Sequence, residues 1–178
     1  MEFMQAAGKN RLTITQLRED AANHRAVTLN GMVHALRPMG GVTFFTLRTQ
    51  AGLVQCVCSK QDAQPDLCEE CAVAASGVLA EEPRAPGGFE LTGAQVTLLS
   101  RPAAPLPVPV CKGGLNLNLD TELSLRPVVV RSLRTRAVFR IQAAITRAFR
   151  DYLQEEGFTE VHTPKIVHAG AEGGSNIF

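Results

Sequence analysis

Aromatic residues are scarce in this 178-residue sequence: it has no tryptophan and one tyrosine, and Phe, Trp and Tyr together make up 5% of its positions. Long apolar runs are also missing, since uncharged stretches such as 91–100 are about half the roughly 20 apolar residues that cross a bilayer. Residues 1–11 lack the basic-then-apolar order of a secretory signal. These absences predict a cytoplasmic globular protein of one or two domains without a membrane partner.

Neither a cysteine framework nor a large net charge is present. The five cysteines are an odd number, which favours free thiols over a set of disulfides. Cys56 and Cys58, followed by Cys68 and Cys71, could supply four thiolates for zinc. The first pair, however, lies in a strand-like run, and no Gly or Pro shapes either pair into a metal knuckle. We therefore expect small buried side chains and no metal site.

The charge is balanced in total but uneven along the chain. Lys and Arg number 18 against 17 Asp and Glu, which excludes a histone-like polycation. Most charged residues in the range 62–90 are acidic, and most charged residues among the first 60 are basic. Residues 126–150 contain seven arginines and no acid. A polyanion could dock on the basic regions, although ordinary solvated surfaces would have the same pattern.

A proline-rich segment divides the chain. Residues 101–109 contain four prolines, which exclude a helix and a central strand. We expect a first domain at 1–101, a linker and hinge at 102–132, and the start of a second domain at 133–178.

The first domain is expected to be mainly β. A Thr13-x-x-Gln16 capping box predicts a short helix through Asp20. Five strand-like runs follow, and a short helical piece is expected at 65–70, after the third; the runs are 26–37, 42–48, 53–58, 72–81 and 89–99. This order fits a small closed Greek-key barrel, the oligonucleotide-binding fold, with a plain five-stranded sheet as the alternative.

The second strand carries a candidate binding surface. If Phe45 and Leu47 face the core, then Phe44 and Arg48 share the outer face, where a ring beside a cation suits single-stranded nucleic acid. A two-residue turn after Arg48 would place Phe44 opposite Gln55, an amide able to read a base edge. Alternatively, Phe44 simply covers an edge of the barrel.

The second domain opens with a long amphipathic helix, whose apolar positions recur every three to four residues from Leu133 to Leu153. Gly157 is expected to end this helix, and residues 158–162 then alternate like a strand before Pro164.

Residues 157–164, Gly-Phe-Thr-Glu-Val-His-Thr-Pro, resemble motif 1 of the class II aminoacyl-tRNA synthetases. In that family the motif forms the dimer interface, which assigns interface roles to Gly157, Phe158 and Pro164. A barrel, a linker and then motif 1 is the order of the subgroup for Asp, Asn and Lys. The chain continues to Phe178 in a way similar to the archaeal-type aspartate enzymes, where the matching loop, here Glu172, Gly173, Gly174 and Ser175, senses the amino acid. Ala171 replaces the usual Thr of that loop.

The resemblance also implies roles within the barrel. Phe44, which follows Gly40 and Gly41, matches the family's anticodon-stacking Phe, and Gln55, eleven residues later, matches a base-reading Gln. Glu90 matches an acid that approaches the anticodon. His34 and Pro83 match positions that set the choice between tRNA(Asp) alone and both tRNA(Asp) and tRNA(Asn), and resemble the non-discriminating type.

The implied activity is ATP-dependent attachment of L-aspartate to tRNA, with ATP and Mg²⁺ as cofactors and a homodimer as the full-length enzyme. The family's motifs 2 and 3 and its acidic Mg²⁺ site follow motif 1, so we expect these 178 residues alone to be inactive. In the hinge, Glu122 stands at a position where the resembled family usually has an Arg. The alternatives are a stand-alone RNA-binding paralogue, an asparagine–tRNA ligase, and a barrel with no RNA role.

Overall fold

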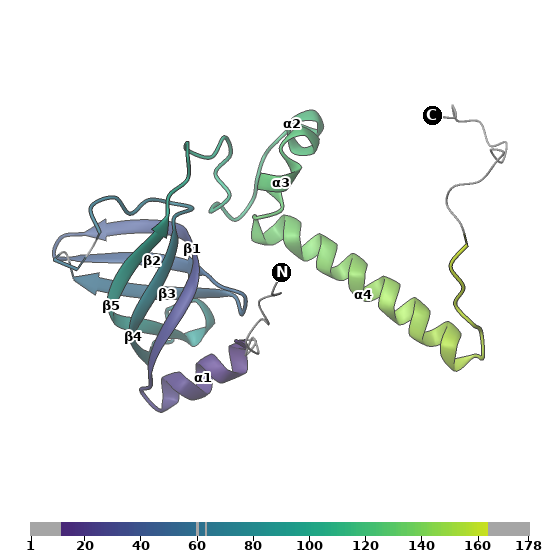
Figure 1. Ribbon diagram of the computed structural model, residues 1–178, viewed down its shortest axis with the longest axis horizontal. Helices are drawn as coiled ribbons and strands as arrows, with labels where there is room; N and C mark the ends of the chain where they lie inside the picture. Colours follow the sequence, from purple (N-terminus) through teal and green to yellow (C-terminus); the bar gives the residue numbers. More distant parts are fainter. Residues whose placement is uncertain (1–11, 60, 63, 164–178) are drawn as a thin grey trace, which may run out of the picture. The chain divides into compact units, whose positions relative to one another are not determined.

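The computed structural model describes residues 12–59, 61, 62 and 64–163, and the chain separates into two compact units, Met1–Ser132 and Leu133–Phe178. Figure 1 shows a β-barrel in the first unit and one long helix in the second.

Five strands form the barrel. They are β1 (Ala26–Met39), β2 (Val42–Arg48), β3 (Leu53–Ser59), β4 (Ala72–Glu81) and β5 (Phe89–Ser100). The sheet closes in the order β1-β2-β3-β5-β4, with β3 and β5 parallel and the other neighbours antiparallel. The closed five-stranded barrel confirms the expected oligonucleotide-binding architecture and rules out the open sheet.

Side-chain alternation in β2 builds one wall of the core. Thr43, Phe45 and Leu47 are buried, and the residues between them are more exposed. The inward set packs with aliphatic and cysteine side chains from all five strands into a single cluster. Period-two alternation is therefore sufficient to predict which face of β2 is buried.

Helix α1 (Ile14–Ala22) closes one end of the barrel. Its capping box is present, because the Gln16 backbone N–H donates to Thr13 Oγ1 and the Thr13 N–H donates to Gln16 Oε1. Leu17 and Ala21 are fully buried and join the barrel core, and the helix packs against β4 and β5. The helix ends two residues beyond the expected Asp20.

The first strand has two partners. Ala26–Met32 pairs with β4 and Met32–Met39 pairs with β2, with a bulge between Val33 and Ala35. At this crossing a Cβ on Gly31 would lie 2.6 Å from the Arg48 carbonyl oxygen, so only glycine fits there.

The expected helix at 65–70 does not form, and these residues make turns instead. Glu70 has φ +66°, which breaks a helical path, and its N–H donates to the Val33 carbonyl at 2.7 Å. The Val33 N–H in turn donates to the Cys71 carbonyl at 2.9 Å. Hydrogen bonds to β1 therefore take the place of those of a helix.

The linker has a small core of its own. Val108, Val110 and Val129 are buried together, with leucines from the same region packed around them. Two short helices follow the proline-rich segment, α2 (Leu119–Ser124) and α3 (Arg126–Val129), and Asn118 caps α2 by accepting from the Thr121 N–H at 2.8 Å. This packing limits the freedom of the linker beyond what its prolines impose.

The second unit is dominated by helix α4 (Leu133–Glu155). Gly157 has φ +85°, its N–H donates to the Gln154 carbonyl, and the Phe158 N–H donates to the Leu153 carbonyl, which is a Schellman cap. The predicted glycine stop is confirmed. Within the described residues 158–163 no strand forms, contrary to expectation, since a strand needs a neighbour to pair with. None of the helices that the structure describes is long and apolar enough to span a membrane.

Candidate nucleic-acid interface

A surface groove crosses β2 and β3 and the loop before β5. Its walls are formed by Phe44, Gln55, Val57, Glu82, Arg84 and Glu90, and an adjoining depression of about 330 Å³ extends it to Arg37 and Met39. Phe44 and Gln55, predicted from the sequence to share a surface, both line it. Glu90 lies beside them because β3 pairs with β5 at Gln55 and Glu90.

The predicted register between β2 and β3 is wrong by two residues. Phe44 lies opposite Val57, and Gln55 lies opposite Thr46. The turn has four residues because Thr49 and Gly52 hold each other through three hydrogen bonds of 2.8–3.2 Å, and Gly52 has φ +146°. An even shift preserves the face of every side chain, so Phe44 and Gln55 remain diagonal neighbours.

Gln55 and Glu90 form a fixed polar pair. The Gln55 Nε2 donates to Glu90 Oε2 at 2.8 Å, and both side chains are half-buried. This bond orients the amide so that its oxygen is directed away from the carboxylate, as an acceptor. A donor edge and an acceptor edge next to the Phe44 ring are the groups needed to hold and read one unstacked base.

The cation beside Phe44 is Arg37. It lies directly opposite Phe44 across the β1–β2 ladder and is exposed. Arg37 was not predicted as a site residue, although Gly40-Gly41 is a two-residue hairpin signal, and counting back from this turn pairs Arg37 with Phe44.

A second cation comes from the loop after β4. Arg84 is 91% exposed and donates to Glu82 through Nε and Nη2 at 2.9 and 3.2 Å. These bonds lower the pKa of Glu82 to about 2 and raise the pKa of Arg84. Pro83 lies between these two residues in the chain and is exposed, but it is not among the residues that line the groove.

Arg48 does not line this groove. Its side chain is 9% exposed and forms an ion pair with Glu70 at 2.8 Å, and Arg131 donates to the same carboxylate at 2.8 Å. The Nη1 of Arg48 lies 3.2 Å from His34 Nδ1, which must accept because a guanidinium can only donate. We call Arg48, Glu70, Arg131 and His34 the clamp. Arg48 is thus on the expected face of β2 but is not a free cation beside Phe44.

The clamp carboxylate remains charged. Burial raises the pKa of Glu70, but hydrogen bonds and the charges of Arg48 and Arg131 outweigh burial and hold it below its ordinary value. The clamp joins β1, β2, the turn before β4 and the turn before α4, all within the first unit. His34 is 5% exposed in the clamp and is not among the residues that line the groove.

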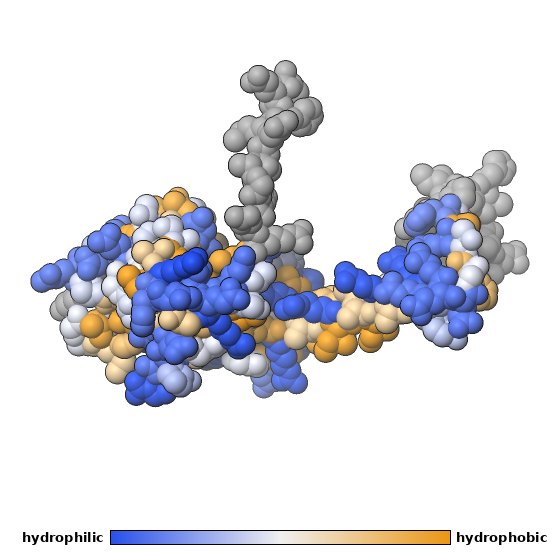
Figure 2. Space-filling model, turned by 90° about the horizontal axis from the view of Figure 1, so that it is seen from below, coloured by the Kyte–Doolittle hydropathy of each residue, from blue (hydrophilic) through white to orange (hydrophobic). Residues whose placement is uncertain are grey.

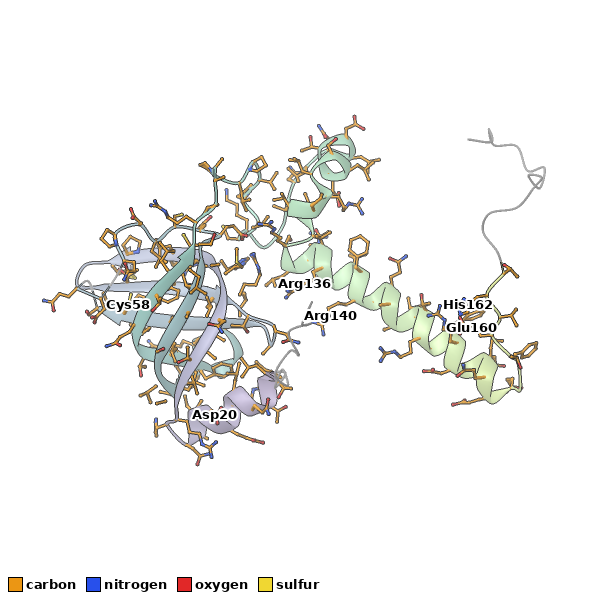
Figure 3. The ribbon with its side chains drawn as sticks, in the orientation of Figure 1. Asp20, Cys58, Arg136, Arg140, Glu160 and His162 are labelled. Carbon is orange, nitrogen blue, oxygen red and sulfur yellow. The ribbon has the colours of Figure 1, made fainter. Side chains whose placement is uncertain are left out.

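Helix α4 presents an unpartnered apolar face. None of its 23 residues is buried, and Ile141, Ile145 and Phe149 are each more than 60% exposed. Figure 2 shows hydrophobic side chains gathered along this helix. After Gly157 the chain turns back, so that Phe158 and Leu153 share a depression at the helix end. Figure 3 shows Glu160 beside the last turns of α4.

Two family models match the chain. One, described as an OB-fold nucleic acid binding domain, matches residues 27–99, and the other, described as tRNA synthetases class II (D, K and N), matches residues 118–178. This chain joins an OB-fold anticodon domain to class II tRNA synthetase sequence. The resemblance to class II synthetases is thereby confirmed.

Curated relatives of this class II sequence are aspartate–tRNA(Asp/Asn) ligases. The enzyme of Deinococcus radiodurans is 44% identical over 154 residues, covering 86% of this chain and 35% of the relative. That of Archaeoglobus fulgidus is 37% identical over 159 residues, covering 85% of this chain and 37% of the relative. The chain thus spans about a third of the length of these relatives.

Solved structures support the fold. The crystal structure of asparaginyl-tRNA synthetase from Pyrococcus horikoshii complexed with asparaginyl-adenylate matches with a TM-score of 0.75 and 22% identity, covering 93% of this chain and 39% of that one. At this identity the match concerns architecture alone.

Several predicted site residues lie outside the described residues: Pro164, Glu172, Gly173, Gly174 and Ser175. Gly157 and Phe158 lie at the end of α4, as described above. Cys56 and Cys58 are buried in the barrel core, where their thiols contact the Val54 and Thr43 carbonyls, and burial raises the pKa of both thiols. In the part of the chain that the structure describes, no group of three or more His, Cys, Asp or Glu residues could hold a metal ion.

Proposed function

We propose that these residues supply the anticodon-binding domain and motif 1 of a cytoplasmic, ATP-dependent aspartate–tRNA(Asp/Asn) ligase. The observation that carries this proposal is the groove in which Phe44, Gln55 and Glu90 converge, together with relatives of that name at 35–44% identity. A further relative, from Thermococcus kodakarensis, is 34% identical and is named for tRNA(Asp) only. Asparagine–tRNA ligase is not favoured, because the Pyrococcus likeness supports only the fold.

The groove would act on an unstacked anticodon base. The Phe44 ring offers the stacking surface. The fixed Gln55–Glu90 pair offers the amide oxygen and the carboxylate as acceptors, and the second amide N–H of Gln55 as a donor, to the base edge. Arg37 and Arg84 are exposed at the same groove and would neutralise neighbouring phosphates. Arg84 must exchange its Glu82 partner for phosphate to do so.

We also propose the matching division of the chain: anticodon barrel at 1–101, linker and hinge at 102–132, and the start of the catalytic domain at 133–178. The acceptance of tRNA(Asn) is proposed to depend on His34 and on Pro83, which lies in the chain between the groove residues Glu82 and Arg84. Because His34 contacts Arg48 and does not line the groove, its influence would pass through the clamp.

The catalytic domain needs more than these residues. Glu172, Gly173, Gly174 and Ser175 are the proposed contacts to L-aspartate, and a homodimer would cover the apolar face of α4 with Gly157, Phe158 and Pro164 at its edge. ATP would supply the activating phosphate and Mg²⁺ would neutralise its charge. Among the described residues, no group of three or more His, Cys, Asp or Glu side chains could hold such an ion. Pyrophosphate exchange by these 178 residues alone is expected to be negative.

Binding of an anticodon stem-loop tests the proposal. Phe44→Ala is expected to weaken affinity about 5- to 150-fold, since stacking on one base contributes about 1–3 kcal/mol. Phe149→Ala, which removes a similarly sized exposed ring from α4, is the matched control and should leave affinity unchanged. Fluorescence anisotropy at one fixed salt concentration provides the measurement. Equal affinity of Phe44→Ala and wild type would rule out the stacking role.

A further inference from the structure

Two thiols are in contact in the turn between β3 and β4. Cys68 Sγ lies 3.3 Å from Cys71 Sγ. Cys68 is exposed and Cys71 is fully buried, so one thiol meets solvent and the other lies just behind it. The proposed tRNA function uses neither of them.

The backbone holds the inner thiol in place. The Cys71 carbonyl accepts from the Val33 N–H at 2.9 Å, and its own N–H donates to the Cys68 carbonyl at 3.2 Å. A disulfide needs an S–S distance of about 2.05 Å, so the sulfurs must approach by roughly 1.3 Å. Rotation of the exposed Cys68 side chain toward the fixed Cys71 sulfur supplies that approach.

A surface cavity gives access to the outer thiol. Cys68 and Glu69 form one wall of a cavity of about 440 Å³, and proline-rich linker residues, including Pro102, Pro105 and Leu106, form the other. Its apolar wall and open side leave room for a small disulfide compound next to the Cys68 sulfur. The other three cysteines are placed differently: Cys56 and Cys58 are inside the barrel, and Cys111 Sγ donates to Glu69 Oε2 at 3.7 Å.

We propose that Cys68 and Cys71 form a reversible dithiol–disulfide modification site whose oxidant is a low-molecular-weight disulfide of the glutathione type. The Cys68 thiolate attacks the oxidant, a mixed disulfide forms at Cys68, and one small thiol leaves. Cys71 then attacks Cys68 Sγ, its proton passes to the second departing thiolate, and the 68–71 disulfide closes. Two protein thiols are oxidised, and one small disulfide is reduced to two thiols.

The contact between the Cys68 and Cys71 thiols also affects how the rate of the first step depends on pH. The hydrogen bond with Cys71, followed by burial, raises the pKa of the Cys68 thiol; the nearby charge of Asp66 raises it further, and that of Arg101 opposes the shift without reversing it. Only the thiolate attacks a disulfide, so the rate should rise about tenfold per pH unit below that pKa. The raised pKa lowers the thiolate fraction at neutral pH and so slows the first step.

Oxidation would act on the clamp, because Glu70 lies between the two cysteines. The disulfide closes a short ring around the residue that binds Arg48 and Arg131. Hydrogen exchange of the turn at residues 65–71 is therefore expected to slow in the oxidised form, whereas the exposed turn at Gly40-Gly41 stays unchanged.

The test is incubation of the folded 178-residue chain with oxidised glutathione, followed by denaturation, alkylation and mass spectrometry. Wild type should lose two of its five alkylatable thiols, with the bond mapped to 68–71. Cys71→Ser should stop at a glutathione adduct on Cys68, and Cys68→Ser should form neither. Cys111→Ser, the matched control, should behave as wild type.

The proposal is overturned if wild type, with its folded circular dichroism intact, keeps five free thiols or joins Cys68 to Cys111. It is also overturned if Cys71→Ser accumulates no adduct. None of these readouts depends on RNA binding, so the outcome is independent of the anticodon proposal.

Discussion

The barrel and helix α4 use similar apolar side chains in opposite ways. Phe45 and Leu47 of the barrel are 1% and 0% exposed, whereas Phe149 and Ile145 of α4 are 63% and 65% exposed. The barrel thus buries its apolar surface within one chain, while α4 displays an equivalent surface along its length. The two regions differ in the burial of their apolar side chains and not in the kind of side chain. The barrel buries its own apolar surface, whereas α4 needs a second surface to cover its apolar face.

Removing a ring from each region should give the largest contrast. Phe45→Ala is expected to lower the free energy of unfolding of the barrel by about 3–5 kcal/mol, because it removes a buried ring and leaves a cavity. Phe149→Ala should change it by less than about 0.5 kcal/mol, since its ring is already in water. Urea unfolding measures both. A comparable loss in the two variants would show that α4 is buried in solution, and sedimentation would then identify a self-associated chain.

The clamp should give the next largest effect. Glu70→Gln removes a buried charge and leaves Arg48 poorly paired, at an expected cost of about 3 kcal/mol. The folded pKa of Glu70 is lowered, so its contribution is present above its unfolded pKa of about 4.3 and is lost as pH falls through the folded value. Urea midpoints of wild type and variant should therefore converge on acidification. If the difference between the two urea midpoints stayed constant down to low pH, Glu70 would not be ionised in the folded protein.

An ion pair in the helical region should give the smallest effect. Arg150 Nε lies 3.0 Å from Glu160 Oε1, but the two side chains are 55% and 40% exposed. Arg150→Ala should cost less than about 1 kcal/mol, and high salt should erase the difference. Thermal melting of α4 by far-ultraviolet circular dichroism at low and high salt provides the measurement. A loss that persisted in high salt would indicate that Arg150 contributes by packing its stem.

The two regions also differ in how much the sequence predicts. In the barrel, β2 and β4 have the predicted bounds, because alternation is a local signal. The register between β2 and β3 depends on a hydrogen bond from the Thr49 side chain. The turn at 65–71 depends on hydrogen bonds to β1. Neither kind of hydrogen bond leaves a periodic pattern in the sequence. The helix and its glycine cap were predicted well. The strand after Gly157 was not, since strands depend on partners outside their own sequence.

The same distinction holds for the groove. The alternation of side chains along a strand was enough to predict that Phe44 faces outward and lies close to Gln55. A register error of two residues leaves every side chain on the same face, so this prediction still held. The choice of Arg48 as the cation failed because the partner that buries it, Glu70, comes from a distant turn with no pattern linking it to β2. Arg37 could have been predicted from the hairpin at Gly40-Gly41. This requires pairing residues across the two strands, because the alternation along one strand does not indicate it.

The division of β1 between two partners has a consequence for synthesis. Its second half can pair with β2 as soon as residue 48 is available, whereas its first half must wait for β4, which begins at residue 72. Until then the stretch from Ala26 to Met32 is an unpaired edge on a growing chain, open to pairing with a neighbour. Ribosomes translating this message thus expose an association-prone strand for the time taken to add β4, and the barrel can close only after β5 joins β3 to β4.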